Sequence, residues 1–326
     1  MKEKKNLFII NSPLQLLNAL EAIYKFKLNN VIMVAIYNRS IKNVEQIEMQ
    51  LSKINCEEII RFNPLIEGKI KGYVRLIKRL QKNIYEKIFT GEIEDYRFKA
   101  ILANLEKEQL FVLDEGSATV SLYESIIKQN KINKFKLKSF KFFLYGLKTN
   151  IKDIINFFSY YSFEPLQNGI VVKNSLEYLK KDFKQNGVNY DNTIFFLGQP
   201  LFIFSNEKQF EDSLKEVIKK YKDKKIIFIP HREDKKILKI VHEIDKNIEI
   251  LELNQPIERY FLEKGIEPRN IISFSSTALT TTKILFKNCN VEYIKNKKPN
   301  LKLSDMQNLC FIYKYFEKSN IKEFKE

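Results

Sequence analysis

The chain has 326 residues, 44% of them hydrophobic and 29% charged, which fits a globular protein of two ordinary domains. No run reaches the roughly 20 uncharged apolar residues that span a bilayer, and the first apolar run is too short for a secretory signal, so we expect a cytoplasmic protein. Three distant cysteines favour neither a disulfide framework nor a zinc site. The net charge of +16 indicates an anionic partner, such as nucleic acid, a nucleotide or a lipid surface, or it reflects heavy lysine use spread throughout the chain.

Strands and helices are predicted to alternate in the first third of the chain. Strands at 7–10 and 31–36 flank a helix at 13–27, which makes a βαβ unit. The pattern continues with a helix at 41–54, a strand at 58–62, a basic helix at 73–89, a segment at 100–105 and a strand at 109–113.

A second alternating set begins near residue 193. Its predicted strands are 193–197, 225–229, 248–252, 271–273 and 291–294, and its helices are 209–221, 257–264 and 277–285. Two such sets predict an α/β protein with two doubly wound, Rossmann-like domains facing a central cleft. We place the first domain at 1–165 and the second at 166–326.

Basic and aromatic residues interleave between 130 and 163, which we interpret as an insertion in the first domain. A helix of this composition could lie on an anionic membrane, with its aromatic rings inserted and its lysines toward the headgroups. Alternatively, the segment is core, a dimer interface or an element exchanged between subunits.

Polar residues follow several of the predicted strands, where ligands of open α/β sheets bind. His231, one of two histidines, comes after the strand at 225–229 and is a candidate for proton or phosphate chemistry, or a surface histidine. Asp114 and Glu115, followed by Gly116, end the strand at 109–113 and suit a general base, or form a polar turn.

The second half carries features of a nucleotide site. Gly198, Gln199 and Pro200 form a turn that could approach a nucleotide, and Ser275 and Ser276 precede a helix whose N-terminus could hold a phosphate or is an ordinary cap. Glu258, on the first turn of another helix, could bind ribose hydroxyls or complement the helix dipole. The absence of Asp-x-Asp and of glycine-rich phosphate loops disfavours a metal clamp and the common dinucleotide and Walker sites.

Taken in order, these motifs resemble those of the bacterial sialyltransferases of glycosyltransferase family 52, relatives of the family 80 enzymes and of bacterial polysialyltransferases. The resemblance starts in the strand-to-helix turn at 11–19, which contains Ser12, Pro13 and Gln15. It continues through the acidic-acidic-glycine motif at 114–116, the turn at 198–200, the histidine at 231 and, after Glu258, the paired serines at 275–276.

The resemblance implies a GT-B fold that uses CMP-sialic acid without a metal or other cofactor, with an acceptor-side domain at 1–165 and a domain that binds the nucleotide donor at 166–326. It implies that Asp114, with Glu115 as second choice, deprotonates the acceptor hydroxyl, and that His231 assists departure of the CMP phosphate. In the donor site, Gly198, Gln199 and Pro200 would line the cytidine pocket. Glu258 would bind the ribose, and Ser275 and Ser276 would bind the phosphate.

We therefore expect an inverting sialyltransferase that acts on a terminal sugar, galactose first, of lipooligosaccharide or a capsular glycan. Its expected partners are the donor, a glycan or glycolipid acceptor, a second copy of the chain and the inner face of the plasma membrane. One alternative keeps the fold and changes the nucleotide-sugar donor. Another is a non-enzymatic, basic membrane- or nucleic-acid-binding protein, although no nucleic-acid-binding motif occurs in the sequence.

Overall fold

The computed structural model describes residues 3–52, 54–129, 131–133, 137–166, 168–181, 188–201, 204, 206–231, 236–296 and 302–325. The chain divides into two compact units. Unit 1 comprises Met1–Glu115 and Leu122–Tyr178, and unit 2 comprises Gly116–Ser121 and Leu179–Glu326. The predicted domain boundary lay between residues 165 and 166. Residues 168–178 nevertheless group with unit 1, because strand β7 (Val171–Lys173) pairs into the first sheet.

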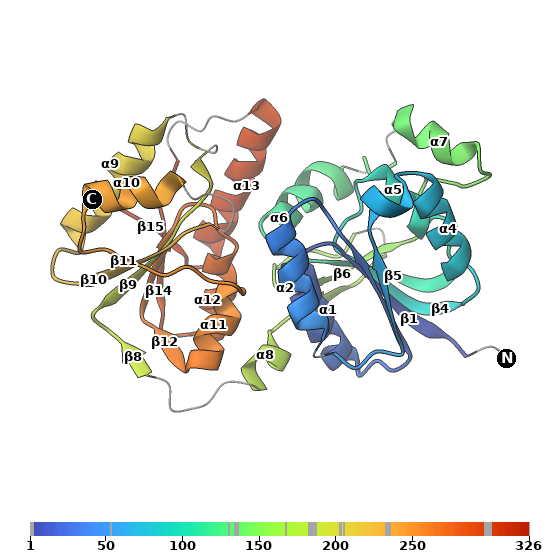
Figure 1. Cartoon of the computed structure of the whole chain (residues 1–326), viewed down its shortest axis with the longest axis horizontal. Helices are drawn as coiled ribbons and strands as arrows, with labels where there is room; N and C mark the ends of the chain where they lie inside the picture. The colour runs from blue at the N-terminus through green and yellow to red at the C-terminus, as the bar shows by residue number, and fades with distance from the viewer. Residues whose placement is uncertain are drawn as a thin grey trace. The chain divides into compact units, whose positions relative to one another are not determined.

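Unit 1 contains a parallel sheet of seven strands among the described residues, in the order β3-β2-β1-β4-β5-β6-β7 (Figure 1). Besides β7, these strands are β1 (Lys5–Ile10), β2 (Val31–Ile36), β3 (Glu58–Phe62), β4 (Tyr85–Thr90), β5 (Lys107–Leu113) and β6 (Ile155–Ser159). Side chains of the central strands are buried on both faces, which explains their nearly continuous apolar sequences.

Helices cover both faces of this sheet. Alternate residues of β1 enter two apolar clusters: Phe8 packs with α1 (Pro13–Phe26) and α2 (Ile41–Leu51), and Leu7 packs with α4 (Lys71–Leu80) and α5 (Tyr96–Leu102). The shorter helical segments of unit 1 are α3 (Pro64–Glu67), η1 (Tyr123–Ile127), η2 (Leu137–Ser139) and α7 (Phe140–Phe143), whereas α6 (Ala118–Leu122) belongs to unit 2 except for its last residue. Unit 1 is therefore a three-layer α/β structure.

The predicted helix at 73–89 is wrong in its second half. Helix α4 ends at Leu80, and residues 85–90 form β4, which pairs with β1 on one side and β5 on the other. The aromatic segment at 130–163 also contains an unpredicted strand, β6, whose Phe157 and Phe158 are buried in the core. Residues 130 and 134–136 of that segment lie outside the described residues.

Unit 2 has, in its described part, a six-stranded parallel sheet in the order β11-β10-β9-β13-β14-β15 and a parallel pair, β8-β12. The strands are β8 (Val188–Tyr190), β9 (Thr193–Leu197), β10 (Lys225–Ile229), β11 (Glu249–Ile250), β12 (Ile266–Pro268), β13 (Asn270–Ser273), β14 (Asn290–Tyr293) and β15 (Lys322–Glu323). The helices are α8 (Glu177–Lys181), which begins in unit 1, α9 (Glu207–Lys220), α10 (Lys236–Ile244), α11 (Ile257–Lys264), α12 (Ala278–Leu285) and α13 (Leu303–Lys318).

Each sheet reverses its strand order once along the chain. In unit 1 the reversal lies between β1 and β4, and in unit 2 it lies between β9 and β13. Ligands of open parallel sheets bind at the carboxyl ends of the strands beside such a reversal. The topology therefore predicts ligand-binding loops after β1 and β4 in unit 1 and after β9 and β13 in unit 2. Of the described helices, none is both long enough and apolar enough to span a bilayer.

Candidate active site

The loop after β1 fixes Gln15 at the strand-order reversal of unit 1. The Ser12 hydroxyl caps α1 by accepting a hydrogen bond from the Gln15 N–H at 3.2 Å, and Pro13 occupies the first turn, where its missing N–H costs nothing. The Gln15 side-chain oxygen accepts a hydrogen bond from the Asn11 N–H at 2.9 Å. Gly91, just after β4, gives this side chain room, since a Cβ there would lie 2.1 Å from Gln15 Cδ.

Asp114 lies inside the fold of unit 1. It is fully buried, and its carboxylate oxygens accept hydrogen bonds from the Ser159 hydroxyl at 2.7 Å and the Tyr160 N–H at 2.8 Å. Burial raises the pKa of Asp114 to about 7, although these two hydrogen bonds act in the opposite direction. This geometry joins β5 to the end of β6 and encloses the carboxylate, while the role of Asp114 as the base stays a prediction.

Glu115 is partly exposed and lies next to Gln15. Burial raises the pKa of Glu115 to about 8, the negative charge of Glu92 adds to the rise, and a hydrogen bond with Gln15 opposes it. Gly116 follows with φ of +72°, a conformation that glycine adopts without strain, so the chain can turn directly after the carboxylate. Of the two acidic neighbours, Glu115 is partly exposed and Asp114 is buried, and which of them acts as the base stays a prediction.

A basic cavity of about 480 Å³ lies at the same edge of the unit 1 sheet. Its cationic lining residues come from four different segments, namely Arg39, Lys69, Arg97 and Lys138. Asp95 pairs with Arg97 at 2.6 Å, and Asn11 joins the cavity to the Gln15 loop. This cavity was not predicted from the sequence, although a basic residue soon after the predicted strand at 31–36 was an available signal.

In unit 2, the ends of β9 and β10 bring the glycine turn beside the histidine. The Gly198 N–H donates to the Ile229 carbonyl at 2.8 Å, and a Cβ on Gly198 would lie 2.7 Å from Phe228 Cζ, so glycine is required for this close approach. Gln199 is partly exposed and Pro200 is buried. His231, two residues beyond Ile229, is partly exposed.

The paired serines lie at the end of the other neighbour of β9. Ser275 and Ser276 are partly exposed between β13 and α12, and the Ser276 hydroxyl accepts a hydrogen bond from the Ala278 N–H at 3.3 Å. Within unit 2, the Thr277 hydroxyl accepts a hydrogen bond from the Ser117 N–H at 2.7 Å. The N-terminus of α12 thus presents hydroxyls and backbone N–H groups, which suit a phosphate.

Glu258 is placed differently from the other candidates of unit 2. It is buried on the first turn of α11, where it accepts a hydrogen bond from the Thr281 hydroxyl of α12, and burial raises its pKa. This contact holds α11 against the helix that follows the serines. A role in binding ribose stays a prediction.

Each unit therefore gathers its candidates at one sheet edge. Ser12, Gln15 and Glu115 meet in unit 1, while Gly198, His231 and the serines follow three adjacent strands, β9, β10 and β13, in unit 2. Within the described ranges, no group of three or more histidine, cysteine and acidic side chains is arranged to hold a metal ion.

Solved structures share this architecture. A 2,6-sialyltransferase of Photobacterium sp. JT-ISH-224, in complex with CMP and lactose, is 13% identical, with a TM-score of 0.56 over 97% of this chain and 76% of that one. The GT-B domain of the Photobacterium damselae sialyltransferase is 12% identical, with a TM-score of 0.51 over 99% of this chain and 100% of that one. S. aureus MnaA with UDP is 12% identical, with a TM-score of 0.57 over 97% of this chain and 88% of that one. These likenesses confirm the predicted GT-B fold of two Rossmann-like domains.

Sequence comparison identifies the family. No curated protein matches the chain. A family model described as "Alpha-2,8-polysialyltransferase (POLYST)" matches residues 6–295, which is most of the chain. The match supports the sialyltransferase resemblance, whereas the assignment to family 52 stays a prediction. The chain belongs to the alpha-2,8-polysialyltransferase family and is a glycosyltransferase.

Proposed function

We propose that the protein transfers sialic acid from CMP-sialic acid to the end of a glycan, with inversion at the anomeric carbon. The observation that carries this proposal is the composition of the unit 2 edge, where a glycine turn, a histidine and a pair of serines follow three adjacent parallel strands. Family membership and the GT-B fold support it.

The donor is proposed to bind in unit 2 without a metal. Its phosphate would lie at the N-terminus of α12, against Ser275 and Ser276, with cytidine at Gly198–Pro200. A CMP leaving group carries a single phosphate, so hydroxyls, amide groups and one imidazole can stabilise the charge that develops as the glycosidic bond breaks. His231 would donate a hydrogen bond or a proton to that phosphate.

The acceptor is proposed to bind in unit 1, with Glu115 as the base. The Glu115 carboxylate would take the proton of the attacking hydroxyl, and Gln15 would hold the carboxylate in place. Asp114, the first choice from sequence, would support the strand end beneath it, because both of its oxygens already accept hydrogen bonds. A pKa of about 8 at Glu115 is well matched to proton transfer near neutral pH.

The basic cavity of unit 1 bears on the choice of acceptor. Arg39, Lys69 and Lys138 offer positive charge beyond that of Arg97, which Asp95 neutralises in part. Cations in a partly enclosed site favour a carboxylate-bearing ligand. We therefore favour an acceptor that ends in sialic acid over one that ends in galactose, on lipooligosaccharide or capsular glycan.

A direct assay tests the donor and the acceptor together. Purified protein is incubated with CMP-sialic acid, or with UDP-hexoses, and with either a lactosyl or a sialyl-lactosyl acceptor, and products are identified by mass. We expect sialylated product only from CMP-sialic acid, more from the sialyl-lactosyl acceptor, and an unchanged rate in EDTA. Product formed only with a UDP-hexose would show that the enzyme uses another nucleotide-sugar donor. A rate abolished by EDTA would refute metal independence.

A further inference from the structure

The short helix α7 and its flanking residues expose an unusual amount of apolar surface. We define the α7 surface as the exposed residues between 137 and 152. Its apolar members include Leu137 at 82% exposure, Phe143 at 70% and Leu144 at 70%, together with Phe140 and Tyr145. Exposed single apolar residues are common, but a cluster of five within nine residues marks a contact surface.

The same stretch is strongly basic. Lys138, Lys141, Lys148 and Lys152 are exposed, and no aspartate or glutamate occurs from 137 to 152. The next acidic residue, Asp153, pairs with the buried Lys107 at 2.9 Å. The surface thus presents apolar side chains and positive charge without acidic residues of its own segment.

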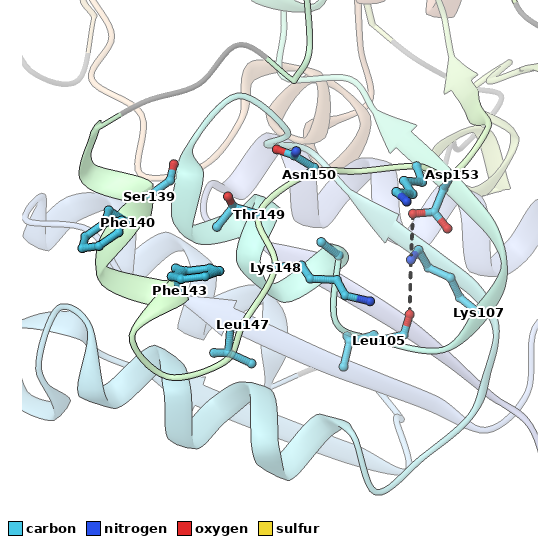
Figure 2. Close-up of a pocket in the computed structure, with 12 residues that line it drawn as sticks. Leu105, Lys107, Ser139, Phe140, Phe143, Leu147, Lys148, Thr149, Asn150 and Asp153 are labelled. Carbon is cyan, nitrogen blue, oxygen red and sulfur yellow. Dashed lines mark hydrogen bonds and ion pairs between the residues drawn. The ribbon is translucent and has the colours of Figure 1, made fainter.

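A cavity of about 590 Å³ opens beside α7. Figure 2 shows the rings of Phe140 and Phe143 on one side of it and the Lys107–Asp153 pair on the other, with Lys148 between them. Apolar walls with lysines nearby suit a ligand that has both a hydrocarbon part and a negative charge.

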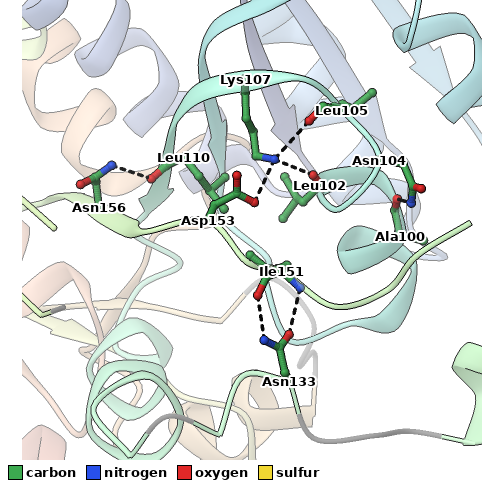
Figure 3. A network of polar contacts seen from close by, with 10 residues as sticks. All are labelled: Ala100, Leu102, Asn104, Leu105, Lys107, Leu110, Asn133, Ile151, Asp153 and Asn156. Carbon is green, nitrogen blue, oxygen red and sulfur yellow. Dashed lines mark hydrogen bonds and ion pairs between the residues drawn. The ribbon is translucent and has the colours of Figure 1, made fainter. Parts of the chain in front are cut away.

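The fold holds this surface in place. Phe142 is fully buried and contacts the rings of Tyr73 and Tyr96, while Phe140 and Phe143 of the same helix are exposed. The segment that follows α7 is fixed by Asn133, whose side chain exchanges two hydrogen bonds with the Ile151 backbone (Figure 3). Exposure of Phe140 and Phe143 is therefore a property of the folded unit.

We propose that the α7 surface docks on a bilayer rich in anionic phospholipid, with Phe140, Phe143 and Leu144 inserted and the lysines at the phosphates. Apolar insertion and electrostatic attraction add in such interfacial contacts. Lys138 also lines the basic cavity of unit 1, so docking would place a membrane beside the proposed acceptor site. The docking proposal itself does not rest on the proposed function.

Two other occupants fit the surface less well. A two-fold contact between copies would be self-complementary, so the lysines of one α7 surface would face those of the other and repel. A single-stranded nucleic acid would stack on the aromatic rings, but it would leave Leu137 and Leu144 exposed.

The absence of tryptophan from the sequence provides a clean probe. Phe143→Trp places a tryptophan on the α7 surface, and Met306→Trp places one at an exposed site of α13 as the matched control. With phosphatidylglycerol vesicles we expect a blue shift of Phe143→Trp emission and quenching by brominated acyl chains. Phosphatidylcholine vesicles and the Met306→Trp control should give neither.

Charge variants test the electrostatic half of the proposal. Lys141→Ala/Lys148→Ala should weaken binding to anionic vesicles by roughly five-fold per lysine, as measured by vesicle sedimentation. Lys219→Ala/Lys222→Ala, an equal charge change at exposed sites of unit 2, should not. Turnover of a soluble acceptor should be unchanged by Phe140→Ser/Phe143→Ser, which separates docking from catalysis.

Four results would overturn the proposal. The first two are Phe143→Trp emission that anionic vesicles leave unchanged and an equal emission change in Met306→Trp. The third is an equal loss of vesicle binding in the two lysine double variants. The fourth is an emission shift of Phe143→Trp that RNA or a raised protein concentration produces and lipid does not.

Discussion

The two sheet edges that carry the candidate site share one topology and differ in chemistry. In unit 1, the edge beside the strand-order reversal holds the carboxylates Asp114 and Glu115, and burial raises the pKa of both. In unit 2, the equivalent edge holds a histidine, two serines and a helix N-terminus. Under the proposed function, the carboxylates of the first edge would take a proton from the acceptor, and the hydroxyls and imidazole of the second would bind the donor phosphate.

The strongest test of this division is Glu115→Gln. We expect kcat to fall by about 10²–10⁴-fold, the usual contribution of a general base, with the affinity for CMP unchanged. The measurement is steady-state kinetics combined with calorimetric titration of CMP. Asp114→Asn serves as the comparison, because an amide can still bond to Ser159 and Tyr160 and should cost less activity. A larger loss in Asp114→Asn would return the base to Asp114.

At the unit 2 edge, His231→Ala should lower kcat by roughly 10²-fold, because the departing phosphate would lose one hydrogen-bond donor. The variant should keep the thermal stability of the parent, because His231 is partly exposed after β10. Activity close to that of the parent in single-turnover assays would remove the histidine from the mechanism.

The serines should affect donor binding more than turnover. Ser275→Ala/Ser276→Ala should raise the KM for CMP-sialic acid by about ten-fold, the size expected for hydrogen bonds to a charged group. The KM for the acceptor should stay the same, since the acceptor is assigned to unit 1. Equal increases in both KM values would show that the variant disturbs more than the phosphate site.

The pH dependence of catalysis should report on Glu115 at the unit 1 edge. Because the raised pKa of Glu115 is about 8, its carboxylate form is lost as pH falls, so kcat/KM should decrease by about ten-fold per unit below pH 8.

The contribution of Glu115 to folding stability should fall as pH rises, whereas kcat/KM should increase. A carboxyl whose pKa is raised in the folded state binds protons more tightly there, so its stabilising contribution is lost as pH rises toward about 8. Thermal melts from pH 5 to pH 9 should therefore show Glu115→Gln gaining stability over the parent as pH rises. A constant difference would contradict the raised pKa.

The local elements were largely predictable because their signals are local. The cap at Ser12 and Pro13, the continuous apolar runs of β9 and β10, and the alternation of strand and helix each depend on nearby residues. The turns at 114–116 and 198–200 were found for the same reason. Strand ends followed by glycine or acidic residues are visible in a sequence.

The prediction of a helix through residue 89 failed because of tertiary context. Residues 85–90 follow a strong amphipathic helix and carry lysine and glutamate, yet they form β4 because β1 and β5 pair with them on both sides. The strand β6 was not predicted for the same reason. It lies in the aromatic segment at 130–163, whose residues between 137 and 152 include the α7 surface.

The sequence alone determined two α/β units and the strand ends where chemistry could occur, since periodicity and turn residues act over a few positions. Only the tertiary structure decided the surroundings of each carboxyl: Asp114 and Glu115 are adjacent in sequence, but one is enclosed by Ser159 and Tyr160 and the other lies beside Gln15. Burial and pairing depend on residues far along the chain, and they set the pKa of each carboxyl and its access to substrate.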